Sequence, residues 1–141
     1  MMIKQLSVFL ENRSGRLTEI TGVLADHGIN ITAQCVAETS DFGILRMVVS
    51  DPEKAQSALS ARGFSVHLTD VLCLTMPNQP GALHRALSVL SAADISIDYM
   101  YAFATGERAF VALRTSDLAR STEVLLADSQ TLLPACEAYS L

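Results

Sequence analysis

Two short loops in this chain carry the residue types that suit binding of a small zwitterion. Each runs from an asparagine to a glycine, Asn12 to Gly15 and Asn78 to Gly81, and each precedes a segment with helical apolar spacing. A glycine at a helix N-terminus leaves backbone N–H groups and the positive end of the helix dipole open to a carboxylate. The asparagine amide can accept a hydrogen bond from an ammonium group and donate to a carboxylate. Alternatively, the asparagines make Asx turns and the glycines satisfy turn geometry, the more common role for any single loop of this kind.

The residues beside each glycine complete the candidate site. Ser14 and Arg16 flank Gly15, and Ala82 follows Gly81. Ser14 is also a suitable helix N-cap, which would begin the helix at this loop. An arginine beside an anion site can bind a carboxylate, whereas most surface arginines are solvated charges.

The chain offers no constellation that suggests catalysis. No nucleophile with a base, no paired carboxylates and no metal-ligand spacing recur at matching positions. The three histidines are interpreted as a helix end, a strand residue and a helix-surface residue, in the order His27, His67 and His84. The cysteines are far apart and are expected to be small core residues in a reducing compartment: Cys35, Cys73 and Cys136. The sequence predicts no catalytic residue, no metal site and no cofactor.

Composition narrows the class of partner. The 141 residues are 50% hydrophobic, carry a net charge of −5 and scatter their Lys and Arg, which disfavours nucleic acid. The N-terminal segment lacks the basic flank and long apolar run of a signal peptide, and no apolar run reaches membrane-spanning length. We expect a cytoplasmic protein that contacts neither nucleic acid nor membrane.

An internal repeat must position the two loops. With a shift of 66 residues, the same residue types recur, and the register holds without a gap over most of the repeat. The matching pairs are Asn12 and Asn78, Gly15 and Gly81, Leu17 and Leu83, Leu24 and Leu90, Ile29 and Ile95, Ile31 and Ile97, Asp51 and Asp117, and Leu59 and Leu125. We expect two domains, residues 1–69 and 70–141, joined rigidly because no Gly, Pro or Ser-rich spacer separates them.

The first copy has the element order βαββαβ. Alternation predicts strands at residues 5–10, 30–38, 43–50 and 65–68. Two helices separate them: one ends at Gly28, and the other begins at the cap Asp51 with Pro52 and ends at Gly63. The first helix is expected to bury a stripe of Leu17, Ile20 and Leu24. One face of the second strand is expected to hold Ile31, Ala33, Cys35 and Ala37.

The second copy repeats this order. We expect strands at residues 71–76, 96–103 and 108–115 and helices at 81–92 and 117–128, with Asp94 adopting the positive φ of Gly28. Pro134 interrupts any strand after Gln130, so no element is predicted there. The fold class is α+β: two tandem ferredoxin-like units, side by side in an eight-stranded antiparallel sheet with the helices on one face.

Residues 10–17 (LENRSGRL) and 28–34 (GINITAQ) resemble the ACT domain family, most closely the serine-binding regulatory domain of phosphoglycerate dehydrogenase. The resemblance covers essentially all of the first copy and, more loosely, the second. In that family two βαββαβ units pair side by side. An amino-acid effector lies between them and touches the Gly-containing loop of one unit and the start of the second strand of the other. The resemblance therefore implies a regulatory protein that senses a free amino acid and performs no catalysis.

The same resemblance assigns the strand starts. It adds Asn30 from the first copy and Ser96 from the second to the candidate site. Pairing about a pseudo-twofold axis would set the Asn78 loop against Asn30 and the Asn12 loop against Ser96. The first combination keeps both asparagines of the family and is expected to be the stronger site. Leu10 stands where the serine-binding relatives carry a histidine, which argues against serine as the ligand.

Association with other chains is also expected. A stand-alone ACT pair has no attached catalytic domain, so regulation would act in trans on an amino-acid metabolic enzyme. An exposed apolar sheet face with Val36, Met100 and Ala102 favours a homodimer. The alternative function is an ACT-fold oligomerisation module that has lost its ligand.

An aromatic stripe in the second copy marks a further difference between the copies. It consists of Tyr99, Tyr101 and Phe103. Such a stripe is typical of core packing, or else it shapes a pocket for a larger apolar side chain.

Overall fold

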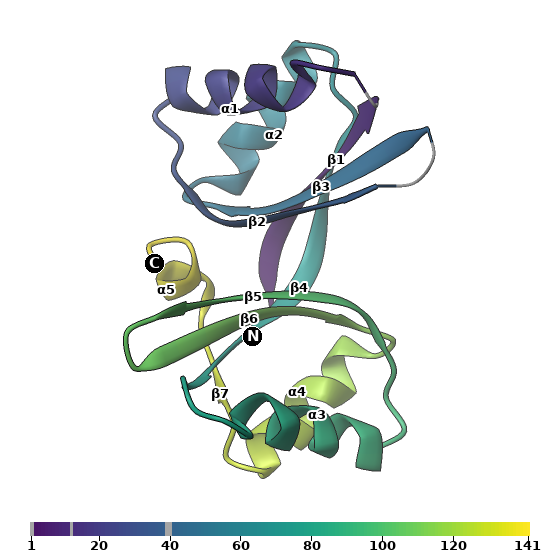
Figure 1. Ribbon diagram of the computed structural model, residues 1–141, viewed down its shortest axis with the longest axis vertical. Coiled ribbons are helices and arrows are strands. Elements are labelled where there is room, and N and C mark those ends of the chain that lie inside the picture. Colours follow the sequence, from purple (N-terminus) through teal and green to yellow (C-terminus); the bar gives the residue numbers. More distant parts are fainter. Residues whose placement is uncertain (1, 12, 39–40) are drawn as a thin grey trace. The chain divides into compact units, whose positions relative to one another are not determined.

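The computed structural model describes residues 2–11, 13–38 and 41–141. Helices and strands alternate as β1 (Ile3–Glu11), α1 (Arg16–Asp26), β2 (Ile31–Glu38), β3 (Phe42–Val49), α2 (Pro52–Ala61), β4 (Val66–Pro77), α3 (Ala82–Ala92), β5 (Ile97–Thr105), β6 (Arg108–Thr115), α4 (Leu118–Ala127), β7 (Thr131–Leu132) and α5 (Ala135–Ala138) (Figure 1). The predicted βαββαβ order is therefore present twice.

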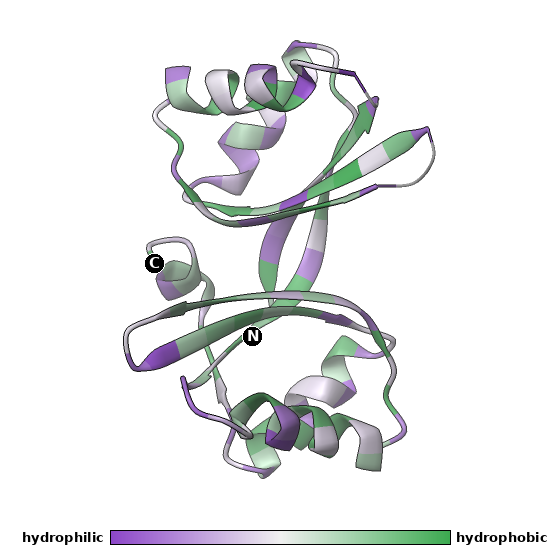
Figure 2. Ribbon diagram, viewed as in Figure 1, coloured by the Kyte–Doolittle hydropathy of each residue, from purple (hydrophilic) through white to green (hydrophobic). Residues whose placement is uncertain are grey.

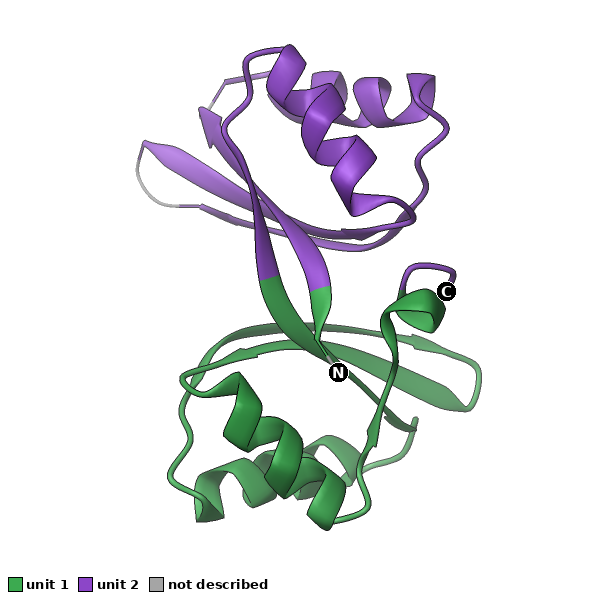
Figure 3. Ribbon diagram, turned by 180° about the vertical axis from the view of Figure 1, so that it is seen from behind, with its two compact units in different colours: residues 1–3, 70–138 green, residues 4–69, 139–141 purple. Residues whose placement is uncertain are grey.

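The chain divides into two compact units (Figure 3). The N-terminal unit contains residues 4–69 and 139–141, and the C-terminal unit contains residues 1–3 and 70–138. Each unit has the ferredoxin-like strand order, which is β2-β3-β1-β4 in the N-terminal unit and β7-β4-β6-β5 in the C-terminal unit. In each unit two helices cover one face of the strands: α1 and α2 in the first, α3 and α4 in the second (Figure 1).

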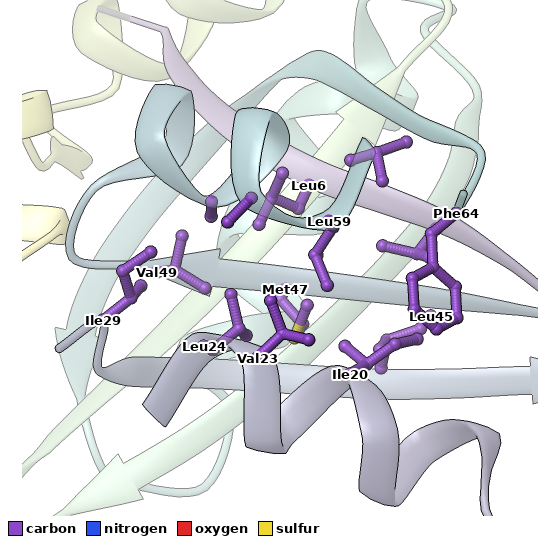
Figure 4. Packing of buried hydrophobic residues seen from close by; sticks show 14 of the residues in the cluster. Leu6, Ile20, Val23, Leu24, Ile29, Leu45, Met47, Val49, Leu59 and Phe64 are labelled. Atoms are coloured by element: carbon purple, nitrogen blue, oxygen red, sulfur yellow. The ribbon is translucent and has the colours of Figure 1, made fainter. Parts of the chain in front are cut away.

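Each unit has its own hydrophobic core between strands and helices. In the N-terminal unit Ile20 and Leu24 of α1 point toward Leu45 and Met47 of β3 (Figure 4). The C-terminal unit repeats the arrangement with Leu90 of α3 among its fully buried residues. Most strand residues are coloured as hydrophobic, and hydrophobic and hydrophilic residues are mixed on the helices (Figure 2). None of the helices within the described residues is long and apolar enough to span a membrane.

The expected count of eight strands was wrong. The two strands predicted at residues 65–68 and 71–76 form one strand, β4, so the described residues contain seven antiparallel strands. The backbone continues through Thr69 and Asp70 because this junction holds no glycine or proline to end the strand. The chain entering β4 bonds to β1, as Phe9 N–H donates to Ser65 O at 3.1 Å, and the later part of β4 pairs with β6 from Leu72 to Pro77.

The helix starts confirm the cap predicted at Asp51 and correct the cap predicted at Ser14. Asp51 and Asp117 cap α2 and α4, and their carboxylates accept hydrogen bonds from the N–H groups of Lys54 and Arg120 at 3.2 and 2.9 Å. Ser14 does not cap α1; Gly15 occupies that position with φ 89° and no side-chain cap bond.

The predicted stripe of α1 is shifted toward its C-terminal end. Ile20 and Leu24 are buried together with Val23, whereas Leu17 is 39% exposed. Leu17 lies in the first turn of α1, where it lines a small hollow together with Leu10 and Glu11 at the end of β1. At the end of the helix, Gly28 has the expected positive φ of 66°, and Asp94 takes the matching conformation at φ 57°.

A β-bulge changes which side chains share a face. The register shifts between Ile31 and Ala33, and again at the matching place between Ile97 and Tyr99. Ile31 packs against the helix-covered core, whereas Ala33 pairs with Val48 one position off the simple alternation. The predicted common face of Ile31, Ala33, Cys35 and Ala37 was therefore wrong at Ile31, because a bulge inserts one residue into the alternation.

The expected apolar face for dimerisation was also misplaced. Val36, Met100 and Ala102 pair with the core residues Leu45, Leu113 and Val111, so their register puts them on the helix side of each sheet. Met100 packs against the C-terminal core, while Val36 remains 51% exposed. The aromatic stripe of Tyr99, Tyr101 and Phe103 lies on the opposite side and is partly buried, with Phe103 stacked on Phe110 at 5.1 Å.

The C-terminal segment supplies the last strand of its unit. The two-residue strand β7 forms before Pro134, and its Leu132 pairs with Leu74 of β4.

The three cysteines differ in burial. Cys73 is buried, Cys35 is intermediate and Cys136 is exposed, so the expectation of a core position was wrong for Cys136. Cys136 lies in the short helix α5, which follows the proline.

Candidate functional site

Both glycine loops turn into their helices with the same backbone conformation. Gly15 has φ 89° and ψ −9° before α1, and Gly81 has φ 87° and ψ −13° before α3. In each unit the glycine carbonyl accepts the first helical bond at 3.0 Å, from Glu19 or from Arg85. Among the described residues, no heavy atom lies within 4 Å of a Cβ built on either glycine. The glycines are therefore required by the left-handed backbone and leave open space beside it.

The asparagine of the second loop has a structural role. Asn78 N–H donates to Glu107 O at 2.7 Å, and its Nδ2 donates to Gly106 O at 3.2 Å. These bonds tie the loop to the turn between β5 and β6. The side-chain bond supports the alternative in which this asparagine fixes loop geometry, while its side-chain oxygen is on an exposed residue that a ligand can reach. Asn12 lies outside the described residues.

Two hollows border the loop of the C-terminal unit. One of about 370 Å³ is bordered by the predicted residues Gly81 and Ala82, and the other, of about 620 Å³, by Asn78. The smaller hollow is also lined by residues from the end of β4, from α3 and from the turn after α4: Thr75, Met76, Pro77, Gln79, Pro80, Arg85, Asp128, Ser129, Gln130 and Thr131. The loop that was selected from the sequence thus borders two hollows of this unit.

Charged residues that the sequence analysis missed lie around these hollows. Arg85 and Asp128 line the smaller one, and Arg108 lines the larger one. Arg108 donates from Nε and Nη2 to Thr75 Oγ1 at 3.1 and 2.8 Å, and its guanidinium lies 5.5 Å from the Phe110 ring. A signal was available in the sequence, because the matching positions of the first copy, Glu19, Arg62 and Phe42, differ in charge.

The backbone beside the smaller hollow is held in an uncommon conformation. Ser129 has φ 62° where the first copy has Gly63 at φ 86°. A non-glycine residue in this region carries strain, and such residues cluster at functional sites. This turn lines the hollow together with the Gly81 loop.

The corresponding loop of the N-terminal unit is covered by its own arginine. Arg16 lies with its guanidinium 4.4 Å from the Phe64 ring, and its Nη1 is 3.1 Å from Glu19 Oε2. The hollows beside it measure about 140 and 190 Å³. Arg16 thus lies at the expected place, but its charge is already engaged. Ser14 is exposed in the same loop.

The two strand starts are held alike. Asn30 N–H donates to Ser50 Oγ at 2.9 Å, and Ser96 N–H donates to Ser116 Oγ at 3.2 Å. Asn30 and Ser96 are both exposed. Thr32, in the bulge after Asn30, has a buried Oγ1 for which the described residues provide no hydrogen-bond partner.

A single unit does not bring its loop and its strand start together. The helix between them has 11 residues in each unit, α1 between Gly15 and Asn30 and α3 between Gly81 and Ser96. At 1.5 Å per residue such a helix is roughly 16 Å long, which exceeds the span of a small amino acid. A ligand that touches a loop and a strand start must therefore take them from two different units.

The described residues hold no group of three His, Cys, Asp or Glu side chains that could bind a metal ion. The histidines lie as interpreted: His27 ends α1 with Nδ1 2.8 Å from Val23 O, and His67 and His84 are exposed on β4 and α3.

Burial raises the pKa of the Cys73 thiol to about 11. The thiol is therefore protonated near neutral pH and is a poor nucleophile.

Comparisons with known proteins agree with this fold. Protein BT0572 from Bacteroides thetaiotaomicron is 51% identical in sequence, with a TM-score of 0.97 over 100% of this chain and 98% of that one. The regulatory subunit of aspartate kinase from Thermus thermophilus, in its ligand-free form, shares the fold with a TM-score of 0.66 at 12% identity, over 88% of this chain and 90% of that one.

A curated relative matches over a shorter segment. The acetolactate synthase small subunit of Buchnera aphidicola subsp. Schizaphis graminum (strain Sg) is 30% identical over 89 residues, 63% of this chain and 56% of the relative. The match thus spans little more than half of that subunit. The family model for an ACT domain pair matches residues 1–136. The chain therefore belongs to the ACT domain pair family, the family that residues 10–34 predicted.

Proposed function

We propose that the chain is a regulatory protein that binds a free amino acid at its ACT loops and acts in trans on an amino-acid metabolic enzyme. The observation that carries this proposal is the Gly81 loop, where a left-handed glycine at a helix start borders open hollows lined by polar side chains. Such a place suits a small ligand with a carboxylate. Family membership supports a regulatory role over a catalytic one.

The proposed partner is an enzyme of amino-acid metabolism. The curated relative is named as the small subunit of acetolactate synthase, which supports action through association with another chain. A homodimer is also part of the proposal, since the two units that a ligand needs can come from two chains as well as from one. The free thiols of the described cysteines suit a reducing compartment such as the cytoplasm.

The residues proposed to bind the ligand are those of the second loop together with a strand start. Asn78, Gly81 and Ala82 supply the loop, and the pairing of this loop with Asn30 remains a prediction. The first loop, with Asn12, Ser14, Gly15 and Arg16, and its counterpart Ser96 form the weaker candidate. Arg16 is engaged by Glu19 and Phe64 and is less available to an anion.

A second candidate function is an ACT-fold oligomerisation module without a ligand. The observation in its favour is that the Asn78 amide already bonds to Gly106, so the loop motif has a purely structural explanation. Light scattering would detect a stable oligomer under either function. Only ligand binding separates the two.

Calorimetric titration tests the proposal. Ligand-free protein is titrated with standard L-amino acids, and each hit is repeated with Asn78→Ala and Asn30→Ala. Ser116→Ala is a matched control, because it removes the serine that holds the start of the other strand. We expect both asparagine variants to weaken binding at least tenfold. Binding that is unaffected in both variants would contradict the assigned site, and the absence of any binding would favour the oligomerisation module.

A further inference from the structure

Equivalent hollows lie beside the glycine loops of the two units. Under the 66-residue shift, seven lining residues of the 190 Å³ N-terminal hollow match seven lining residues of the 370 Å³ C-terminal hollow. These are Phe9, Leu10, Glu11, Arg16, Gly63, Phe64 and Ser65 in the first and Thr75, Met76, Pro77, Ala82, Ser129, Gln130 and Thr131 in the second. The two spaces therefore occupy the same place in the fold but differ in their walls.

The N-terminal hollow contains its own cation. The Arg16 guanidinium lies 4.4 Å from the ring of Phe64, which is 5% exposed, and Glu19 binds Nη1 at 3.1 Å. A cation over an aromatic face and an ion pair one helical turn away both hold the side chain in this position. The Arg16 Nε is buried and has no hydrogen-bond partner among the described residues. Arg16 therefore lines and narrows this hollow, which measures about 190 Å³ compared with about 370 Å³ in the C-terminal unit.

Each residue of this arrangement is replaced in the C-terminal unit. Ala82 stands for Arg16, Arg85 for Glu19 and Gln130 for Phe64. The methyl group of Ala82 cannot cross the hollow, and no aromatic ring is present at position 130 to hold a cation. The result is an open space at the same place in the fold.

The charges at the edge of the hollow are also reversed between the units. Arg85 and Asp128 stand where the N-terminal unit has Glu19 and Arg62. Asp128 Oδ2 accepts a hydrogen bond from Gln130 Nε2 at 3.0 Å, which orients the carboxylate at the turn after α4. Arg85 lines the same hollow from α3. A guanidinium can bind a carboxylate with two parallel hydrogen bonds, and an aspartate accepts hydrogen bonds from an ammonium group.

We propose that the hollow beside the Gly81 loop binds the α-amino acid as a zwitterion, with Arg85 on its carboxylate and Asp128 on its ammonium group. Arg16 narrows the equivalent hollow of the N-terminal unit to about 190 Å³, and its guanidinium is already paired with Glu19, so each chain takes one ligand in this way. This inference rests on the proposed amino-acid binding. It names two binding residues outside the loop motif and makes the two ACT units unequal.

The test is calorimetric titration of the full chain with the panel of standard L-amino acids. Wild type is expected to bind one ligand per chain. Arg85→Ala and Asp128→Ala should each weaken the affinity at least tenfold, whereas Arg62→Ala, the matched change in the N-terminal unit, should leave it unchanged. The amide and the N-acetyl derivative of the bound amino acid should also bind at least tenfold more weakly. A triple variant, Ala82→Arg with Arg85→Glu and Gln130→Phe, copies the N-terminal arrangement and should abolish binding.

The outcomes separate this inference from the proposed function. If an amino acid binds with unchanged affinity in Arg85→Ala and Asp128→Ala, or binds twice per chain, the inference is overturned while amino-acid sensing stands. If no amino acid binds to the wild type, both are overturned. Circular dichroism verifies that each variant is folded, and the two single changes at exposed positions decide the question if the triple variant does not fold.

Discussion

Gly81→Ala measures how strongly the ligand-facing loop depends on its left-handed backbone. Gly81 has φ 87°, and a Cβ at this position meets no heavy atom of the described residues within 4 Å. The left-handed conformation costs a residue with a Cβ about 1–2 kcal/mol. Alanine regains about 0.4–1 kcal/mol because it restricts the unfolded chain. We therefore expect a net loss of about 1 kcal/mol in the free energy of unfolding, with strain as its source.

The matched control is Gly22→Ala in the middle of α1. A Cβ at Gly22 likewise meets no heavy atom of the described residues within 4 Å, but this glycine has helical backbone angles. Alanine is more stable than glycine in a helix interior by roughly 0.5–1 kcal/mol, so this variant should gain stability. The free energy of unfolding should thus fall in Gly81→Ala and rise in Gly22→Ala, and the two variants should differ by about 1.5–2 kcal/mol.

Urea denaturation followed by circular dichroism measures both changes from the transition midpoints at constant slope. Gly81→Asn should recover part of the loss, because asparagine adopts the left-handed region more readily. If Gly81→Ala is as stable as the wild type or more stable, the requirement for a left-handed glycine is refuted. The same result would remove the backbone argument for a shared geometry in both loops of this chain.

Three further changes test other parts of the structure. Asp117→Ala removes the hydrogen bond to Arg120 N–H at the start of α4 and should cost about 1 kcal/mol of unfolding free energy in urea titrations; no loss would show that the cap is unimportant. Leu90→Ala empties a fully buried position in the C-terminal core and should cost about 2–5 kcal/mol, with a smaller loss contradicting the packing described. In the native protein at about pH 8, iodoacetamide should label exposed Cys136 well before buried Cys73, because the raised pKa keeps the Cys73 thiol neutral; mass spectrometry of peptides reads the order, and equal labelling would contradict it.

Local signals in the sequence predicted most elements of the fold. Asp51 caps its helix as expected, and the matching Asp117 caps α4 in the same way, because a carboxylate followed by a helical segment acts within one turn. Because of the 66-residue repeat, the elements predicted for one copy could also be predicted for the other. This includes the positive φ of Asp94, which stands in place of Gly28. The fold class was predictable for the same reason, since it depends on spacing that the chain displays twice, whereas the family followed from the resemblance of residues 10–17 and 28–34.

The differences arose where structure depends on distant pairing. The bulges after Ile31 and Ile97 are shifts in the register of β2 against β3 and of β5 against β6. No residue type within the strands predicts these shifts. The short strand β7 forms because Leu132 pairs with Leu74 of β4, which lies almost sixty residues earlier in the chain. Such pairings need the assembled sheet and could not be derived from local alternation.

The sequence predicted the backbone of the candidate site, namely the two glycine loops, but not the side chains that line the hollows. The paired glycines identified the loops, and both have the expected place at a helix start. The walls of the hollows come from segments far along the chain, such as Phe64 beside Arg16 and Gln130 near Ala82. A comparison of charges at matching positions of the two copies distinguishes Arg85 and Asp128, because each replaces a residue of opposite charge.

A thermal-shift screen of ligand-free protein against the standard amino acids tests the central claim most directly. A ligand that binds only the folded state adds RT ln(1 + [L]/Kd) to its stability, about 2.7 kcal/mol at a concentration of 100 Kd. We predict a selective rise in the unfolding temperature for one amino acid or a few of related side chain. A flat response to every amino acid at millimolar concentration would contradict amino-acid sensing by this chain.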